Sequence, residues 1–206
     1  MTYAKALKRA SQSLCGYAGA SLSSAFFSPR RSKRGYNVAW FFLGPQQLQN
    51  DKALDLVRAL APDIGLVIRS YGASGKAQVR QLMTLAKVQR RICLLAPESA
   101  AGFGRHIPRW QRPQRRMSTV MSMSVHSAAE AIRARRSGAD LVFISPVFDT
   151  QSHVGAPALG LYQARRLARM ARRPAYALGG LNNVSRLRVL GPGFAGFAGI
   201  SGFSAL

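Results

Sequence analysis

The chain has 206 residues, 48% of them hydrophobic, which is long and apolar enough for one folded domain and excludes a disordered chain. Thirty Lys and Arg against seven Asp and Glu give a formal net charge of +23, which makes nucleic acid, anionic membranes or phosphorylated small molecules natural partners. No apolar run approaches the roughly 20 residues that span a bilayer, and Cys15 and Cys93 have neither metal-binding nor redox spacing, so we expect a reduced, cytoplasmic protein without a membrane partner.

The positive charge is spread over several expected helices and does not form one stripe. The arginines concerned are Arg133, Arg135 and Arg136, then Arg165, Arg166 and Arg169, then Arg186 and Arg188. An arginine-rich composition explains this scatter, and no nucleic-acid-binding motif accompanies it. We expect no specific nucleic-acid partner, and a nucleic-acid-binding protein remains a minor alternative.

Residues 1–35 differ in composition from the rest of the chain. They are rich in Ser and Ala, contain a basic run at residues 30–34 and lack any acidic residue. Such a segment reads as a basic N-terminal extension, either a flexible tail or a helix that covers the bottom of the domain. The folded domain is expected from residue 36 to residue 206.

From Tyr36 onward, short apolar runs alternate with segments of helical periodicity. Strands are expected at 38–43, 64–68, 92–95, 119–123, 141–144, 175–178 and 194–200, and helices at 47–60, 76–89, 128–137, 159–172 and 184–190. The region 97–113 has a weak pattern, in which Phe103–Pro108 is the one candidate for a further strand. His106 in that region is expected to face a loop, without a role.

This alternation predicts an α/β protein with parallel strands and right-handed crossovers. Eight strands in about 170 residues indicate a compact (β/α)8 TIM barrel, and an open doubly wound sheet is the alternative. The barrel is favoured because phosphate-binding signals follow the expected seventh and eighth strands, where such barrels commonly bind phosphate. Three successive strands near the C-terminus end in small residues suited to holding an anion. Those ends are the loop 145–153, Gly179-Gly180 and Ser201-Gly202.

An ordered set of motifs over about 80 residues resembles the thiamine phosphate synthase/TenI family. The matching segments are Ser124–Ser127, Gly138–Asp140, Ser145–Phe148 with Thr150–Ser152, Ala177–Gly180 and Gly196–Ser201. The resemblance implies an enzyme of thiamine biosynthesis that binds a thiazole phosphate. A synthase of this family is a transferase: it joins that compound to a pyrimidine diphosphate and releases pyrophosphate.

The resemblance also assigns expected roles to individual residues. The phosphate and thiazole would be bound by Thr150, Gln151, Ser152, Gly179, Gly180, Ile200 and Ser201. The pyrimidine diphosphate would be bound by Arg69, Ser124 and His153. These partners are small phosphorylated substrates, and the oligomeric state stays open, a homodimer included.

The chain departs from the family pattern where a synthase holds Mg²⁺. Two positions that carry acidic residues in the family are not acidic here. The one after the third strand falls on Ala96-Pro97, and the one at the start of the Phe103–Pro108 element falls near Phe103. Two positions around Arg69 that are Gln and Lys in the family are Val67 and Tyr71. If the protein is a synthase, the resemblance implies Mg²⁺ as its cofactor. Mg²⁺ requires oxygen ligands, usually carboxylates, and the usual ones are missing here, so we assign no metal-binding residue.

His126 supports a different activity within the same family. In the TenI branch a histidine in this setting is the acid and base that tautomerises a thiazole phosphate, without a metal. A histidine titrates near neutral pH and suits such proton transfer, so His126 is the candidate catalytic residue. The alternatives are therefore a divergent synthase, a thiazole tautomerase (an isomerase) and a non-catalytic binder of phosphorylated ligands.

Overall fold

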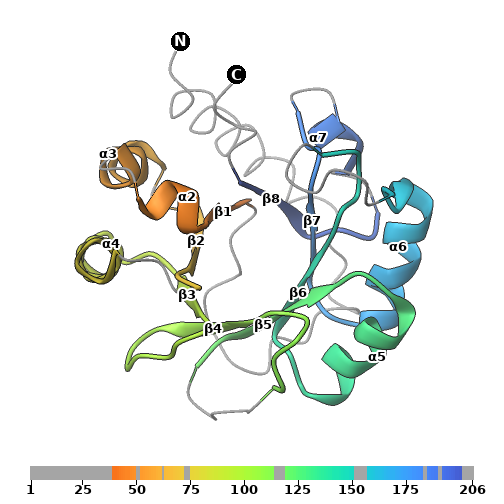
Figure 1. Cartoon of the computed structure of the whole chain (residues 1–206). Helices are drawn as coiled ribbons and strands as arrows, with labels where there is room; N and C mark the ends of the chain where they lie inside the picture. The colour runs from red at the N-terminus through yellow and green to blue at the C-terminus, as the bar shows by residue number, and fades with distance from the viewer. Residues whose placement is uncertain are drawn as a thin grey trace.

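The protein forms a closed barrel of eight parallel strands, seen in a computed structural model (Figure 1). The structure describes residues 39–49, 52–61, 63–71, 75–113, 119–150, 157–182, 185–189 and 192–200. Each strand pairs in parallel with the next along the chain, and the last pairs with the first, for example Trp40 with Ala198. This confirms the expected (β/α)8 barrel over the open sheet.

The strands are short and almost wholly buried. They are β1 (Ala39–Leu43), β2 (Gly65–Arg69), β3 (Cys93–Ala96), β4 (Gly104–Ile107), β5 (Met121–Val125), β6 (Leu141–Ile144), β7 (Ala175–Leu178) and β8 (Gly196–Gly199). The ranges of β6 and β7 are those expected from sequence. The fourth strand falls inside the region of weak pattern, and β5 begins at residue 121, two residues later than predicted.

The helices lie around the outside of the barrel, with α2, α3 and α4 on one side of it and α5, α6 and α7 on the other (Figure 1). They are α2 (Pro45–Leu48), α3 (Lys52–Ala59), α4 (Lys76–Val88), α5 (Ala128–Arg136), α6 (Gly160–Ala171) and α7 (Ser185–Val189). The single helix expected over 47–60 is therefore two helices. None of the helices in the described residues is long and apolar enough to cross a membrane.

Alternation of side chains along the strands produces two apolar layers. Side chains that point inward fill the barrel, and among them Trp40, Phe42, Phe143 and Tyr176 contact one another edge-on or tilted. The side chains between them point outward and pack against the helices. The barrel interior is thus a packed core, which restricts any ligand site to the mouth at the carboxyl ends of the strands.

Arg91, just before β3, fixes the end of α3. Its guanidinium donates hydrogen bonds to the carbonyl oxygens of Val57, Leu60, Ala61 and Ile64, and its Nε donates to Gln89 at 2.7 Å. The last carbonyl groups of a helix have no partner within the helix. A buried cation at this point satisfies them and joins α3 to the barrel.

The predicted extension at residues 1–35 lies outside the described residues, which begin at Ala39. The division of the chain at residue 36 stays a prediction.

Candidate functional site

Polar side chains from neighbouring strands meet at the mouth of the barrel. Arg69 ends β2, His106 lies in β4, Ser124 lies in β5, and His126 follows β5 directly. The His106 ring packs edge-on against Phe42 and Phe143, with ring centroids 5.5 and 5.6 Å apart. The aromatic core therefore forms the floor of a polar site.

Arg69 is a largely buried cation without a matching carboxylate. Its guanidinium carbon lies 5.2 Å from the centroid of the Phe42 ring. Its Nε is buried without a hydrogen-bond partner among the described residues, and neither of the two ion pairs found there involves it. Burial lowers the pKa of the Arg69 guanidinium. A desolvated, unpaired arginine is costly for folding and forms a strong site for an anionic ligand.

His106 is buried inside the barrel, which corrects the expectation that it faces a loop. Its Nδ1 lies 2.8 Å from Ser122 Oγ, and its Nε2 lies 3.1 Å from Ser124 Oγ. Burial first, and then the electrostatic effects of Arg69 and His126, lower the pKa of His106 to about 3. His106 is therefore neutral at physiological pH.

The hydrogen bonds of His106 determine the direction of the Ser124 hydroxyl. Ser122 Oγ donates to the carbonyl oxygen of Arg105, so it accepts the proton on His106 Nδ1. Nε2 is then the acceptor, and Ser124 donates its proton to it. The remaining lone pairs of Ser124 Oγ are free to accept a hydrogen bond from a ligand N–H group.

His126 is oriented by the strand next to it. Its Nδ1 lies 2.6 Å from the carbonyl oxygen of Ser145 and so donates to it, which leaves Nε2 as the ring nitrogen available for proton exchange. The backbone N–H of His126 donates to Glu130 Oε2 at 2.6 Å. Both ring and backbone of His126 are therefore held in place.

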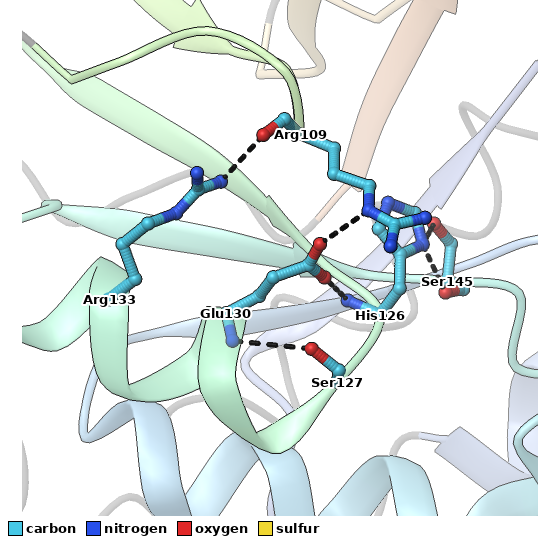
Figure 2. A network of polar contacts seen from close by, with 6 residues as sticks. All are labelled: Arg109, His126, Ser127, Glu130, Arg133 and Ser145. Carbon is cyan, nitrogen blue, oxygen red and sulfur yellow. Dashed lines mark hydrogen bonds and ion pairs between the residues drawn. The ribbon is translucent and has the colours of Figure 1, made fainter.

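Glu130 connects His126 to the loop after β4, as Figure 2 shows. Its other oxygen pairs with Arg109 Nε at 2.9 Å, and its backbone N–H donates to Ser127 Oγ, the N-cap of α5. Arg133, one turn further along α5, donates to the carbonyl oxygen of Arg109 at 3.0 Å. The start of α5 thus positions both His126 and the segment that follows β4.

The turn after β7 brings Gly179 and Gly180 against the loop after β6. Both glycines have positive φ values, +93° and +65°. A Cβ atom on Gly180 would overlap the carbonyl group of Phe148 and the carbonyl oxygen of Asp149. These glycines are therefore required by the fold itself, whether or not they also bind phosphate.

The remaining predicted residues are only partly described. Ile200 is half-buried directly after β8 and packs on the barrel core, and Thr150 is half-buried after β6. Gln151, Ser152, His153 and Ser201 lie outside the described residues. Their assignments stay predictions.

The side chains at the mouth do not fit the two-carboxylate Mg²⁺ site of a synthase. Glu98 is the acidic residue nearest the position expected after β3, and its carboxylate accepts a hydrogen bond from Ser70 Oγ. Glu130 is paired with Arg109 and the His126 N–H. Among the described residues, no three His, Cys, Asp or Glu side chains gather where they could hold a metal ion.

The sequence interpretation missed His106, although a signal was present. Gly104 and His106 alternate with outward-facing residues in β4, and Ser122 and Ser124 do the same in β5. Alternation at period two would have placed the histidine and both serines on one inward face. The weak apolar pattern around β4 concealed this signal.

Comparisons with known proteins match the C-terminal part of the chain to one family. Residues 108–203 match the family model described as thiamine monophosphate synthase. The thiamine-phosphate synthase of Pyrococcus furiosus is 34% identical over 82 residues, which are 40% of each chain. That of Methanocella arvoryzae is 37% identical over 83 residues, 40% of this chain and 39% of the relative. The chain therefore matches less than half the length of these curated relatives.

A solved structure extends the similarity of fold to most of the chain. The thiamine phosphate pyrophosphorylase from Pyrococcus furiosus superposes with a TM-score of 0.64 at 20% identity, covering 81% of this chain and 87% of that one. At this identity the match establishes the barrel fold alone.

Proposed function

We propose that this chain is a divergent synthase of the thiamine phosphate synthase/TenI family, because residues 108–203 match the model of that family and the thiamine-phosphate synthase of Pyrococcus furiosus is 34% identical over 82 residues. It binds a thiazole phosphate, joins it to a pyrimidine diphosphate and releases pyrophosphate. The observation that carries the proposal is Arg69, a largely buried cation without a carboxylate partner among the described residues, at the mouth of the barrel.

The leaving diphosphate is the group that needs positive charge in this reaction. Arg69 is fixed over Phe42 in surroundings from which water is largely excluded, where charge stabilises a developing anion more strongly than in water. Ser124, directed by His106, accepts a hydrogen bond from the pyrimidine, and His153 contacts the diphosphate. These residues orient one substrate.

The second substrate binds at the ends of β6, β7 and β8. Gly179, Gly180, Ile200 and Ser201 hold the phosphate, and Thr150, Gln151 and Ser152 contact the thiazole. Leu178 of β7 pairs with Ala198 of β8, so the carboxyl ends of these two strands are neighbours. Their position at the same end of the barrel as Arg69 is the expected arrangement for joining two phosphorylated molecules.

The usual cofactor of a synthase, Mg²⁺, would shield the charge of the diphosphate. Glu98 and Glu130 are engaged by Ser70 and Arg109 and do not form the two-carboxylate site for that ion, and no step of the proposed reaction depends on it. One arginine replaces only part of a divalent charge. We expect slow turnover and poor Mg²⁺ binding in the absence of substrate.

A thiazole tautomerase is the second candidate, and the geometry of His126 favours it. Its Nδ1 is engaged by the Ser145 carbonyl, which leaves Nε2 to take a proton from one atom of the thiazole and return it to another. A non-catalytic binder of phosphorylated ligands is the third candidate. It would have the same ligand contacts and neither activity.

His126→Asn separates these candidates. Asparagine preserves a hydrogen bond to the Ser145 carbonyl and cannot exchange a proton near neutral pH. We expect a synthase to keep most of its turnover, whereas a tautomerase would lose about 100-fold or more. Mass spectrometry of both products in wild type and variant measures this. Synthase turnover that falls together with tautomerisation would contradict the assignment, and absence of both activities in the wild type would leave only a binder.

A further inference from the structure

Trp110 is a large apolar side chain that lies exposed beside the site. It follows β4, and 68% of its surface is accessible. The only other tryptophan in the chain, Trp40, is 2% exposed inside the barrel. Burial of an indole would be strongly favourable, so its exposure in this position requires an explanation.

The backbone around Trp110 is anchored on both sides. Arg109 pairs with Glu130 and receives a hydrogen bond from Arg133 on its carbonyl oxygen. Gln111 donates from its side chain to the Pro97 carbonyl at 3.5 Å and from its backbone to the Pro108 carbonyl at 3.1 Å. The indole is therefore presented by a turn that is tied to α5 and to the loop after β3.

Tyr71 extends this surface toward Arg69. Its ring lies 6.0 Å from that of Trp110, at an interplanar angle of 60°. Its φ of +22° is unusual for a residue other than glycine, and such backbone values cluster at functional sites. Burial raises the pKa of the Tyr71 hydroxyl, with an opposing effect of the Arg69 charge, which places the phenol within the electrostatic reach of the arginine.

We propose that Tyr71 and Trp110 form an aromatic wall of the substrate site, and that Trp110 stacks on the planar ring of the substrate whose diphosphate binds Arg69. The ligand class is a phosphorylated aromatic heterocycle, and under the proposed function it is the pyrimidine diphosphate. The inference rests on that function for the identity of the ring.

The arrangement of charge and aromatic surface supports this occupant. Arg69 is separated from Tyr71 by one residue, and Tyr71 contacts Trp110, so an anion site continues into an aromatic surface. A ligand with an anionic end and a flat ring matches both parts. Stacking of a heterocycle on an exposed aromatic side chain tolerates variation in the ring and strengthens binding substantially.

Tryptophan fluorescence of the full chain tests the proposal, because Trp110 is the exposed emitter. The probes are the pyrimidine diphosphate and inorganic diphosphate, which shares the charge and lacks the ring. We expect the pyrimidine diphosphate to quench the emission and to bind more tightly than inorganic diphosphate. Trp110→Ala lacks this emitter, so its affinities are measured by titration calorimetry beside those of the wild type. The variant should bind the pyrimidine diphosphate about tenfold more weakly, within the range of base–aromatic stacking, and inorganic diphosphate as the wild type does.

Two further variants complete the test. Trp110→Phe retains a ring and should keep most of the affinity. Tyr162→Ala removes an aromatic residue of similar exposure, 79%, from α6 and should change nothing. In turnover assays, Trp110→Ala should raise KM about tenfold with little change in kcat, because the ring positions the substrate and takes no part in bond breaking.

Equal affinity of wild type and Trp110→Ala for the pyrimidine diphosphate would overturn the inference and leave the proposed function intact. So would a wild type that binds the pyrimidine diphosphate no better than inorganic diphosphate. A change of oligomeric state in Trp110→Ala, measured by sedimentation, would also overturn it by identifying the indole as a subunit contact. Ring-dependent binding without product formation by the wild type would instead contradict the proposed function alone.

Discussion

His106 shows how a single buried residue makes this barrel sensitive to acid. Its pKa is lowered to about 3 in the folded protein, whereas an exposed histidine in the unfolded chain titrates near 6.5. Between these values the unfolded chain binds a proton that the folded protein does not. The free energy of unfolding therefore falls as the pH falls through this window, by at most about 1.4 kcal/mol per pH unit for one proton.

We predict that His106→Gln reduces this dependence on pH. Glutamine retains hydrogen-bonding groups for Ser122 and Ser124 and has no proton to gain. Urea unfolding of wild type and variant at pH 7 and pH 5 measures the change in stability between the two conditions. The variant should lose less stability than the wild type. An equal loss in both proteins would mean that His106 is not the group responsible.

Residues at the mouth differ in how far the sequence predicted them. Arg69, Ser124 and His126 were expected there, because motifs resembling a family placed them after or within particular strands. His106 was not, since its role depends on serines 16 and 18 positions away in the chain. Trp110 and Tyr71 belong to no motif that predicts a contact between them. Their contact depends on how the folded chain brings the loops after β2 and β4 together.

At the scale of elements, the turn after β7 serves the fold as well as the proposed phosphate site. Gly180 has φ of +65°, and a Cβ there would overlap the backbone of the loop after β6. Gly160 at the start of α6 has a similar φ of +68°, with nothing within 4 Å of a Cβ. Substitutions at Gly160 and Gly180 therefore distinguish the energetic cost of backbone strain alone from the cost of strain together with steric overlap.

We predict that Gly180→Ala is considerably more destabilising than Gly160→Ala. A left-handed alanine costs about 1 kcal/mol, which is the expected loss for Gly160→Ala. Gly180→Ala should cost about 3 kcal/mol or more, because it also displaces backbone. Urea unfolding measures both. Equal losses would show that the loop after β6 moves aside freely, and Gly180 could then be assigned to ligand binding alone.

Element boundaries were predictable where apolar runs were bounded by turn residues. Leu141–Ile144 and Ala175–Leu178 are such cases, each followed by Ser-Pro or Gly-Gly. β4 was obscured because its inward positions are Gly104 and His106, which lack the apolar signature of a barrel strand. The division of 47–60 into two helices also lay beyond the pattern, since apolar spacing continues across the break.

Across the whole molecule, the barrel and the similarity of residues 108–203 to one family say more about function than the net charge does. Arginines at the surface serve diverse local purposes: Arg165 donates to the Arg188 carbonyl, and Arg173 to that of Arg135. These contacts join helices to their neighbours and do not form one continuous stripe. The expectation that the protein has no specific nucleic-acid partner stays a prediction, as does the location in the cytoplasm.

We propose that this barrel joins two phosphorylated molecules with Arg69 as the cation for the leaving diphosphate. Product formation from the thiazole phosphate and the pyrimidine diphosphate, followed by mass spectrometry with and without Mg²⁺, tests it in wild type and Arg69→Gln. Exposed Arg80 on α4 provides the control variant Arg80→Gln, which should behave as the wild type.

We predict slow product formation by the wild type, little affected by chelation of Mg²⁺, and a loss of about 100-fold or more in Arg69→Gln, as when one group that stabilises a developing anion is removed. Arg69→Gln should be at least as stable as the wild type, because an unpaired buried charge is gone. Strong turnover that requires Mg²⁺ and persists in Arg69→Gln, or no product from the wild type at all, would contradict the account.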